Sequence, residues 1–280
     1  MNTSKQLKDL INNKAKQYNL NPQILLTRFF MERFLERISL SKYKNNFVLK
    51  GGILISSMVG VDFRMTKGMD LTIKNLPLDE IFIKNALEEI SKIKIDDGTI
   101  FEILDVLSIR EEFEYSGFRA RLKCQLDRTK NIIQIDITTG DVITPSEVVY
   151  SYDLLIEKRK IDITCYPIET IFAEKIESIL SKNITTTRMK DFYDCYMLGK
   201  LYLKDLNKNN LILALKNTTK VRKTEFIFND IKETIDLISN DENLNFLWQA
   251  YSSQFGYAKD ITFENTIQQL TLILKFINLI

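Results

Sequence analysis

The chain has 280 residues, which is enough for one large domain or two smaller ones with a buried core. Hydrophobic residues make up 45% and charged residues 27%, as in ordinary globular proteins, and the net charge of +2 gives no overall sign of nucleic-acid binding. The absence of histidine excludes Ser-His-Asp and Cys-His catalysis and every metal site with an imidazole ligand. Among the remaining possibilities, this composition favours a site in which carboxylates bind a hard divalent cation.

The three cysteines, Cys124, Cys165 and Cys195, are widely spaced and form no CxxC pair, so we expect neither a disulfide framework nor a zinc site. Cys124 and Cys195 have apolar neighbours and are expected in the core. The polar N-terminal sequence lacks the apolar segment of a secretory signal, and no apolar run is long enough to span a membrane. We therefore expect a cytoplasmic protein.

The N-terminal part of the chain predicts two helices, a short strand and a third helix. Residues 4–18 form a polar helix, and Pro22 fits the first turn of a second helix whose apolar pattern runs to about Ile38. The apolar residues 47–49 predict a short strand, and residues 53–59 predict a short buried helix. A glycine pair separates this strand from the helix.

The middle of the chain combines one helix with several strands. Residues 69–73 predict a strand and residues 78–92 a helix. The apolar period then changes to two, which predicts a meander of successive strands. These strands are expected at residues 99–109, 118–125 and 132–138. Residues 161–165 predict a further short strand.

From Pro167 onward the sequence predicts only helices, joined by short polar segments. Three helices are expected within residues 169–217 and two or three more within residues 223–280. A mixed first part and an all-helical second part predict an α+β fold in two lobes. The first lobe comprises residues 1–166 with the N-terminal helices, and the second comprises residues 167–280.

The segment Lys50-Gly51-Gly52 lies between the predicted short strand and the buried helix. Glycines at such a turn let the backbone approach a phosphate closely, and the N-terminus of a helix offers unpaired N–H groups. A tight turn without any ligand explains the same pattern, so both interpretations stay open.

Two aspartates interrupt strands that are otherwise apolar. Asp70 needs a partner or a metal ion unless it faces solvent at a strand edge, and Arg64 and Thr66 before it are candidates for binding phosphate oxygens. Arg64 is equally compatible with a solvated surface charge. Asp136 could meet Asp70 on one sheet, where two carboxylates repel each other unless a cation such as Mg²⁺ neutralises them. An edge strand with Asp136 facing water is the alternative.

The helical lobe carries a second group of charged residues. Lys175 lies in the middle of a predicted helix, and RMKDFYD places Lys190, Asp191 and Asp194 on another. Asp191 and Asp194 are three residues apart and are therefore neighbours on the helix surface. Taken alone, this pattern favours a solvated helix face with an ion pair between Lys190 and Asp194.

Together these motifs resemble the AbiEii/AbiGii family of nucleotidyltransferase-like toxins, which is part of the DNA-polymerase-β-like nucleotidyltransferase superfamily. The resemblance covers most of the chain, from ERFLERISLSKYKNNFVLKGGILI through FRMTKGMDLTI, IDITTGDVITP, YPIETIFAEKIESI and TRMKDFYDCYML to LWQAYSSQFGYA. It implies an α/β core with a mixed sheet, followed by an all-α lobe.

In this family a Gly-Ser or Gly-Gly turn is followed by an Asp-x-Asp pair that binds metal. The resemblance implies that Asp70 is the second aspartate of the pair and that the first falls at Gly68, where this chain has no carboxylate. Asp136 corresponds to the third metal-binding carboxylate. The lysine of the helical lobe and the Lys-Asp-x-x-Asp element correspond to Lys175, Lys190, Asp191 and Asp194.

The implied activity is transfer of a nucleotidyl group from a nucleoside triphosphate to an acceptor, with Mg²⁺ or Mn²⁺ bound by Asp70 and Asp136. The Asp191/Asp194 pair contacts the nucleotide or helps to position the acceptor. The residues implied to contact the nucleotide are Lys50, Gly51, Gly52, Arg64, Thr66, Lys175, Arg188 and Lys190. The resemblance also implies a toxin–antitoxin or abortive phage-infection system, with an antitoxin encoded beside the toxin and RNA, including the tRNA acceptor end, as the acceptor.

Gly68 leaves the activity of this chain open, because loss of ~3–5 kcal/mol of transition-state stabilisation lowers the rate by about two to four orders of magnitude. The chain is an inactivated version of a toxin, a naturally degenerate homologue, or an enzyme that uses another ligand such as Asp191 or Asp194. Two other functions compete with RNA modification: binding of nucleotide or RNA without turnover, and transfer of a nucleotide to a protein hydroxyl.

Overall fold

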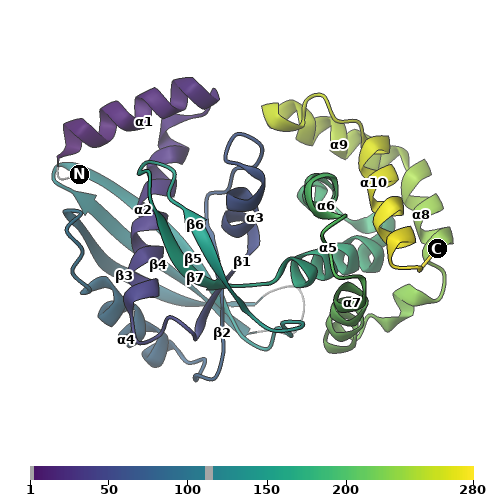
Figure 1. The fold of residues 1–280 in the computed structure, drawn as a ribbon, viewed down its shortest axis with the longest axis horizontal. Helices are drawn as coiled ribbons and strands as arrows, with labels where there is room; N and C mark the ends of the chain where they lie inside the picture. Colours follow the sequence, from purple (N-terminus) through teal and green to yellow (C-terminus); the bar gives the residue numbers. More distant parts are fainter. Residues whose placement is uncertain (1–2, 111–115) are drawn as a thin grey trace. The chain divides into compact units, whose positions relative to one another are not determined.

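A computed structural model describes residues 3–110 and 116–280, and the chain divides into two compact units (Figure 1). The first unit comprises Met1–Gly140 and Glu147–Cys165, and the second comprises Asp141–Ser146 and Tyr166–Ile280. The predicted α+β fold is confirmed, since a mixed sheet with helices forms the first unit and helices form the second. The domain boundary at residue 166 stays a prediction.

Seven strands of the first unit form one sheet in the order β3-β4-β5-β2-β1-β7-β6. The strands are β1 (Phe47–Lys50), β2 (Met69–Ile73), β3 (Thr99–Arg110), β4 (Ser116–Leu126), β5 (Thr129–Thr138), β6 (Val148–Asp153) and β7 (Lys160–Cys165). Strand β2 pairs with β5 in parallel, as β1 does with β7, whereas the other neighbours are antiparallel. This mixed sheet brings strands from distant parts of the sequence together.

The helices of the first unit are α1 (Ser4–Tyr18), α2 (Pro22–Leu40), α3 (Gly51–Val59) and α4 (Glu80–Ser91). Helix α2 begins as expected, because the Asn21 side chain caps it and Pro22 occupies its first turn. Helix α2 packs on β5 and β7 and also on α4, which packs on β3. These two helices therefore cover one face of the sheet, and the apolar strand residues on that face form the core.

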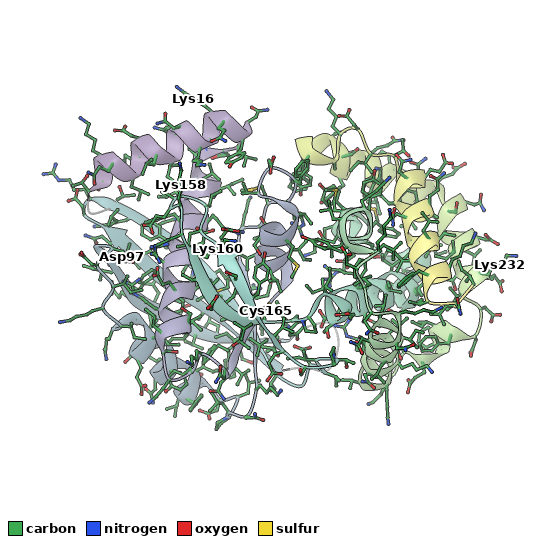
Figure 2. The ribbon with its side chains drawn as sticks, viewed as in Figure 1. Lys16, Asp97, Lys158, Lys160, Cys165 and Lys232 are labelled. Carbon is green, nitrogen blue, oxygen red and sulfur yellow. The ribbon has the colours of Figure 1, made fainter. Side chains whose placement is uncertain are left out.

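Helix α2 also buries charged side chains, and ion pairs compensate for their burial. Arg28 Nε lies 2.7 Å from Glu32 Oε1 within the helix. Arg37 donates to both carboxylate oxygens of Asp97, at 2.9 and 3.0 Å, and Asp97 lies against α2 in Figure 2. The Arg37–Asp97 pair connects α2 to the polypeptide that leads into β3.

The second unit consists of helices and the short segment 141–146. Its helices are α5 (Ile168–Lys182), α6 (Met189–Tyr202), α7 (Lys208–Arg222), α8 (Ile231–Asn240), α9 (Glu242–Gln254) and α10 (Phe263–Phe276). The backbone N–H of Thr144 donates to Thr170 Oγ1 at 2.9 Å, which attaches the segment to α5. Phe192 and Phe263 pack edge to face in the core, and Trp248 is buried beside Phe263.

All three cysteines are buried and none forms a disulfide, so the expected core positions of Cys124 and Cys195 are confirmed. Burial raises the pKa of Cys124 and of Cys165 to about 12, and it also raises the pKa of Cys195. Of the helices within residues 3–110 and 116–280, none combines the length and the apolar character that are needed to cross a lipid bilayer.

Candidate active site

The turn between β1 and α3 is built around two glycines. Gly51 has a φ of +68°, a conformation that other residues adopt only with strain. A Cβ atom added at Gly51 would lie 2.7 Å from the Asp70 carboxyl carbon, so the missing side chain makes room for that carboxylate. The backbone N–H of Gly52 donates to Asp70 Oδ2 at 3.3 Å. The first turn of α3 therefore binds and orients the Asp70 carboxylate.

Arg64 and Thr66 lie against the same turn. A Cβ atom at Gly52 would lie 2.9 Å from Thr66 Oγ1 and 3.7 Å from Arg64 Nη2. Thr66 Oγ1 donates to the carbonyl of Gly68 at 3.3 Å, and Arg64 Nη1 donates to the carbonyl of Met65. These bonds fix the loop that leads into β2.

The sheet register places four charged residues in one row across four neighbouring strands. Lys50 on β1 pairs with Asp70 on β2, Asp70 with Asp136 on β5, and Asp136 with Arg119 on β4. Directly paired residues point to the same face of a sheet, and neighbouring strands lie about 4.8 Å apart. Asp136 alternates with the buried residues Ile135 and Ile137, so the row lies on the face opposite to α2.

The Asp136 carboxylate is held by side chains of its own sheet. Arg119 donates from Nε to Oδ1 and from Nη2 to Oδ2, both at 2.8 Å, which is the bidentate geometry of a strong guanidinium–carboxylate pair. Gln134 Nε2 adds a third hydrogen bond to Oδ1 at 3.3 Å.

Gly68 lies two residues before Asp70, at the position where the resemblance implies the first aspartate of the pair. A Cβ atom there would approach only the carbonyl oxygen of Gln134, at 3.8 Å, which is an ordinary contact. The position also lacks the positive φ that would favour glycine. The backbone at position 68 therefore accommodates a Cβ atom without strain.

A second group of charged residues lies within the second unit, between α5 and α6. Lys175 Nζ lies 2.5 Å from Asp191 Oδ1 and 3.1 Å from Asp194 Oδ2. Asp191 Oδ2 accepts from Ser178 Oγ at 3.0 Å and lies 3.0 Å from Arg188 Nε. The Asp191 and Asp194 side chains are 1% and 0% exposed, so the lysine is held by two buried carboxylates.

The pKa of Asp191 reflects this surrounding charge. Burial by itself raises the pKa, but the charges of Lys175 and Arg188 and the hydrogen bond from Lys175 outweigh it and lower the pKa to about 2. Asp191 is consequently an anion at neutral pH and forms an ion pair with Lys175.

Several of the alternative interpretations of these residues are wrong. Arg64 is only 6% exposed and is not a solvated surface charge. Strand β5 lies between β4 and β2, and β2 lies between β5 and β1, so neither Asp136 nor Asp70 is on an edge strand. Asp191 and Asp194 are buried and do not form a solvated helix face.

Three residues were missed in the sequence: Arg119 and Gln134, which contact Asp136, and Ser178, which contacts Asp191. The sequence of the β4–β5 hairpin could have identified Arg119. If residues are paired one by one on either side of the two-residue turn Asp127-Arg128, Arg119 pairs with Asp136. Ser178 follows Lys175 by three residues and shares its helix face, but many helices have this spacing.

Asp70 and Asp136 are the residues that fit a divalent cation. Mg²⁺ is commonly bound by one or two carboxylates together with substrate phosphates, and these two aspartates lie side by side in the register. Within the part of the chain that the structure describes, no cluster of three or more Cys, Asp or Glu side chains is arranged to hold a metal ion. The donor set therefore fits a two-carboxylate site and lacks the third carboxylate of the family pattern.

Comparison with known proteins agrees with this architecture. In solved structures, MenT4, a nucleotidyltransferase toxin from Mycobacterium tuberculosis, is similar with a TM-score of 0.57 and 12% identity, over 95% of this chain and 98% of that chain. JHP933 from Helicobacter pylori has a TM-score of 0.54 and 17% identity, over 92% of this chain and 93% of that chain. At such identities the likeness shows a common fold, and no curated protein matches the sequence.

The family model of the nucleotidyl transferase AbiEii toxin of type IV toxin–antitoxin systems matches residues 33–269. The match includes both the sheet row with Asp70 and Asp136 and the helical group with Lys175. The chain therefore belongs to the AbiEii family of nucleotidyltransferase toxins.

Proposed function

We propose that this chain is a toxin that transfers a nucleotidyl group from a nucleoside triphosphate to RNA, and in particular to tRNA, with Mg²⁺ or Mn²⁺. The observation that carries the proposal is the pairing of Asp70 with Asp136 on adjacent strands, beside the glycine turn at the start of α3. Two neighbouring carboxylates at a helix N-terminus suit a site for a cation and a triphosphate.

Each residue of the sheet site has a separate task in this proposal. Gly51 leaves space for the Asp70 carboxylate, and the Gly52 N–H orients it. Arg64, Thr66 and Lys50 bind phosphate oxygens. A divalent cation held by the two aspartates would lower the pKa of the attacking hydroxyl and screen charge on the leaving pyrophosphate.

The helical group supplies a fixed positive charge. Lys175 is paired with two buried carboxylates, which hold its ammonium group in one place. We assign Lys175, Arg188 and Lys190 to the nucleotide, and Asp191 and Asp194 to positioning Lys175. Charge fixed in advance stabilises a transition state better than charge that must first be ordered.

Gly68 lowers the activity in this proposal, because the first aspartate of the pair is the ligand that both cations share. If its loss removes ~3–5 kcal/mol of transition-state stabilisation, the rate is about two to four orders of magnitude lower. The same residue favours one other function, which is binding of nucleotide or RNA without turnover. Isothermal titration with each triphosphate, with and without Mg²⁺, detects such binding.

The biological setting that we propose follows from the family. We infer that the chain acts in the cytoplasm, that an antitoxin encoded beside it neutralises it, and that the system arrests growth during phage infection. Co-expression with the neighbouring gene, scored as rescue of growth, tests the antitoxin part.

Transfer of label from each of the four α-labelled triphosphates to total RNA tests the proposed activity. We expect slow labelling by the unaltered chain and none by Asp136→Asn. Asp105→Asn is the matched control, because Asp105 is a carboxylate on the same sheet that pairs with Arg121 rather than with the site. Labelling that persists in Asp136→Asn contradicts the proposal, and label on protein instead of RNA shows a different acceptor.

A further inference from the structure

Arg119 occupies both oxygens of a carboxylate that the proposed function assigns to metal binding. Its two hydrogen bonds to Asp136 are 2.8 Å long, and its side chain is 42% exposed while that of Asp136 is 20% exposed. The pair lies in the row that continues to Asp70, so the guanidinium lies on the far side of Asp136 from Asp70.

The charge of this row differs from that of a three-carboxylate site. With three aspartates, a charge of about −3 calls for two divalent cations. Here Gly68 removes one carboxylate, and Arg119 neutralises most of the charge on another. Asp70 is the carboxylate of the row that Arg119 does not neutralise, and Lys50 lies beside it in the register, so the row suits one divalent cation together with a triphosphate rather than two cations.

We propose that Arg119 takes over the charge of one of the two divalent cations, so that this chain binds a single cation at Asp70. The inference rests on the proposed function, since it concerns the same site. Arg119 is a positioning residue here: it holds Asp136 in place and competes with a cation for its oxygens.

Mn²⁺ binding without nucleotide, followed by the paramagnetic resonance of the free ion, tests this inference separately from activity. Arg119→Gln removes the competing charge, and we expect Mn²⁺ to bind about fivefold more tightly, equivalent to about 1 kcal/mol. Arg119→Lys keeps the charge and is expected to retain the original affinity. Arg121→Gln is the matched control, because Arg121 lies two residues along β4 and pairs with Asp105 instead.

Stoichiometry gives a second readout. We expect one Mn²⁺ per chain for the unaltered protein and two for the double variant Gly68→Asp/Arg119→Gln. Unchanged or weaker binding by Arg119→Gln, or an equal gain in Arg121→Gln, overturns the inference while leaving the metal site in place. If Asp70→Asn leaves Mn²⁺ binding unchanged, the metal site itself is wrong and the proposed function fails with it.

Discussion

The buried pair of Asp191 and Lys175 leads to a prediction about acid stability. Asp191 accepts hydrogen bonds from Lys175 at 2.5 Å and from Ser178 at 3.0 Å, and its side chain is 1% exposed. Burial raises its pKa, but Lys175 and Arg188 lower it to about 2 from an ordinary value of 3.8. We therefore expect Asp191→Asn to change how stability depends on pH.

The magnitude follows from this pKa difference. A group whose pKa is lowered by folding stabilises the protein above its unfolded pKa, and this contribution disappears as the pH falls through the folded pKa. For Asp191, the contribution is present above about pH 4 and is lost by about pH 2. It corresponds to about 2 kcal/mol of unfolding free energy.

The single tryptophan provides the assay. Trp248 is buried in the second unit, as is Asp191, so its fluorescence during urea unfolding reports on the unit concerned. Between pH 5 and pH 2, the unaltered chain should lose about 2 kcal/mol more than Asp191→Asn. Asp205→Asn changes an exposed carboxyl of the same unit and should follow the unaltered chain. Identical pH profiles for Asp191→Asn and the unaltered chain would refute the reasoning.

Two further predictions follow from the glycine turn and the buried thiols. Gly51→Ala should destabilise the protein by about 1–3 kcal/mol in thermal unfolding, because Gly51 has a φ of +68° and its added Cβ atom would meet the Asp70 carboxylate. Gly256→Ala is the control and should have little effect, because a Cβ atom there meets nothing within 4 Å. Equal melting temperatures for the two variants would contradict this account. Burial raises the pKa of Cys124 and Cys165 to about 12, so no thiol should react with Ellman's reagent at pH 8 until the protein is unfolded. Rapid reaction of the native protein would contradict this prediction, because it would show that a thiol is accessible.

Elements with a strong apolar period could be predicted from the sequence, and elements without one could not. Strand β5 alternates apolar residues because it buries one face, whereas helix α2 is rich in apolar residues and is buried on all sides from Arg28 to Ile38, and both lie where the pattern places them. Strand β6 was missed: of its six residues, only Tyr152 is buried, so the alternation has little contrast. Strand β6 is held in the sheet by its pairing with β7, which its own sequence pattern does not predict.

The site residues that could be predicted from the sequence are the charged ones, because a charged side chain is costly to bury without a partner. Asp70 and Asp136 are charged residues in apolar strands, and the resemblance to a family added their relation to Gly68. Arg119 was not predicted, because an arginine on the exposed face of a strand is common. Its role becomes visible only when the hairpin register pairs it with Asp136. Ser178 depends on the packing of α5 against α6, which local sequence does not specify.

The central claim is that the sheet site catalyses nucleotidyl transfer and is limited by Gly68. The most direct test compares Gly68→Asp with Gly68→Asn for transfer of labelled nucleotide to RNA and for growth arrest. Among the described residues, a Cβ atom at position 68 comes within 4 Å of the Gln134 carbonyl oxygen alone, at 3.8 Å, and the two side chains have the same shape, so both variants should fold alike and melt at similar temperatures. We predict that the aspartate variant is toxic and faster than the unaltered chain by about two to four orders of magnitude, whereas the asparagine variant is not. Equal rates for the two variants, or an aspartate variant that is neither toxic nor active, would contradict the account.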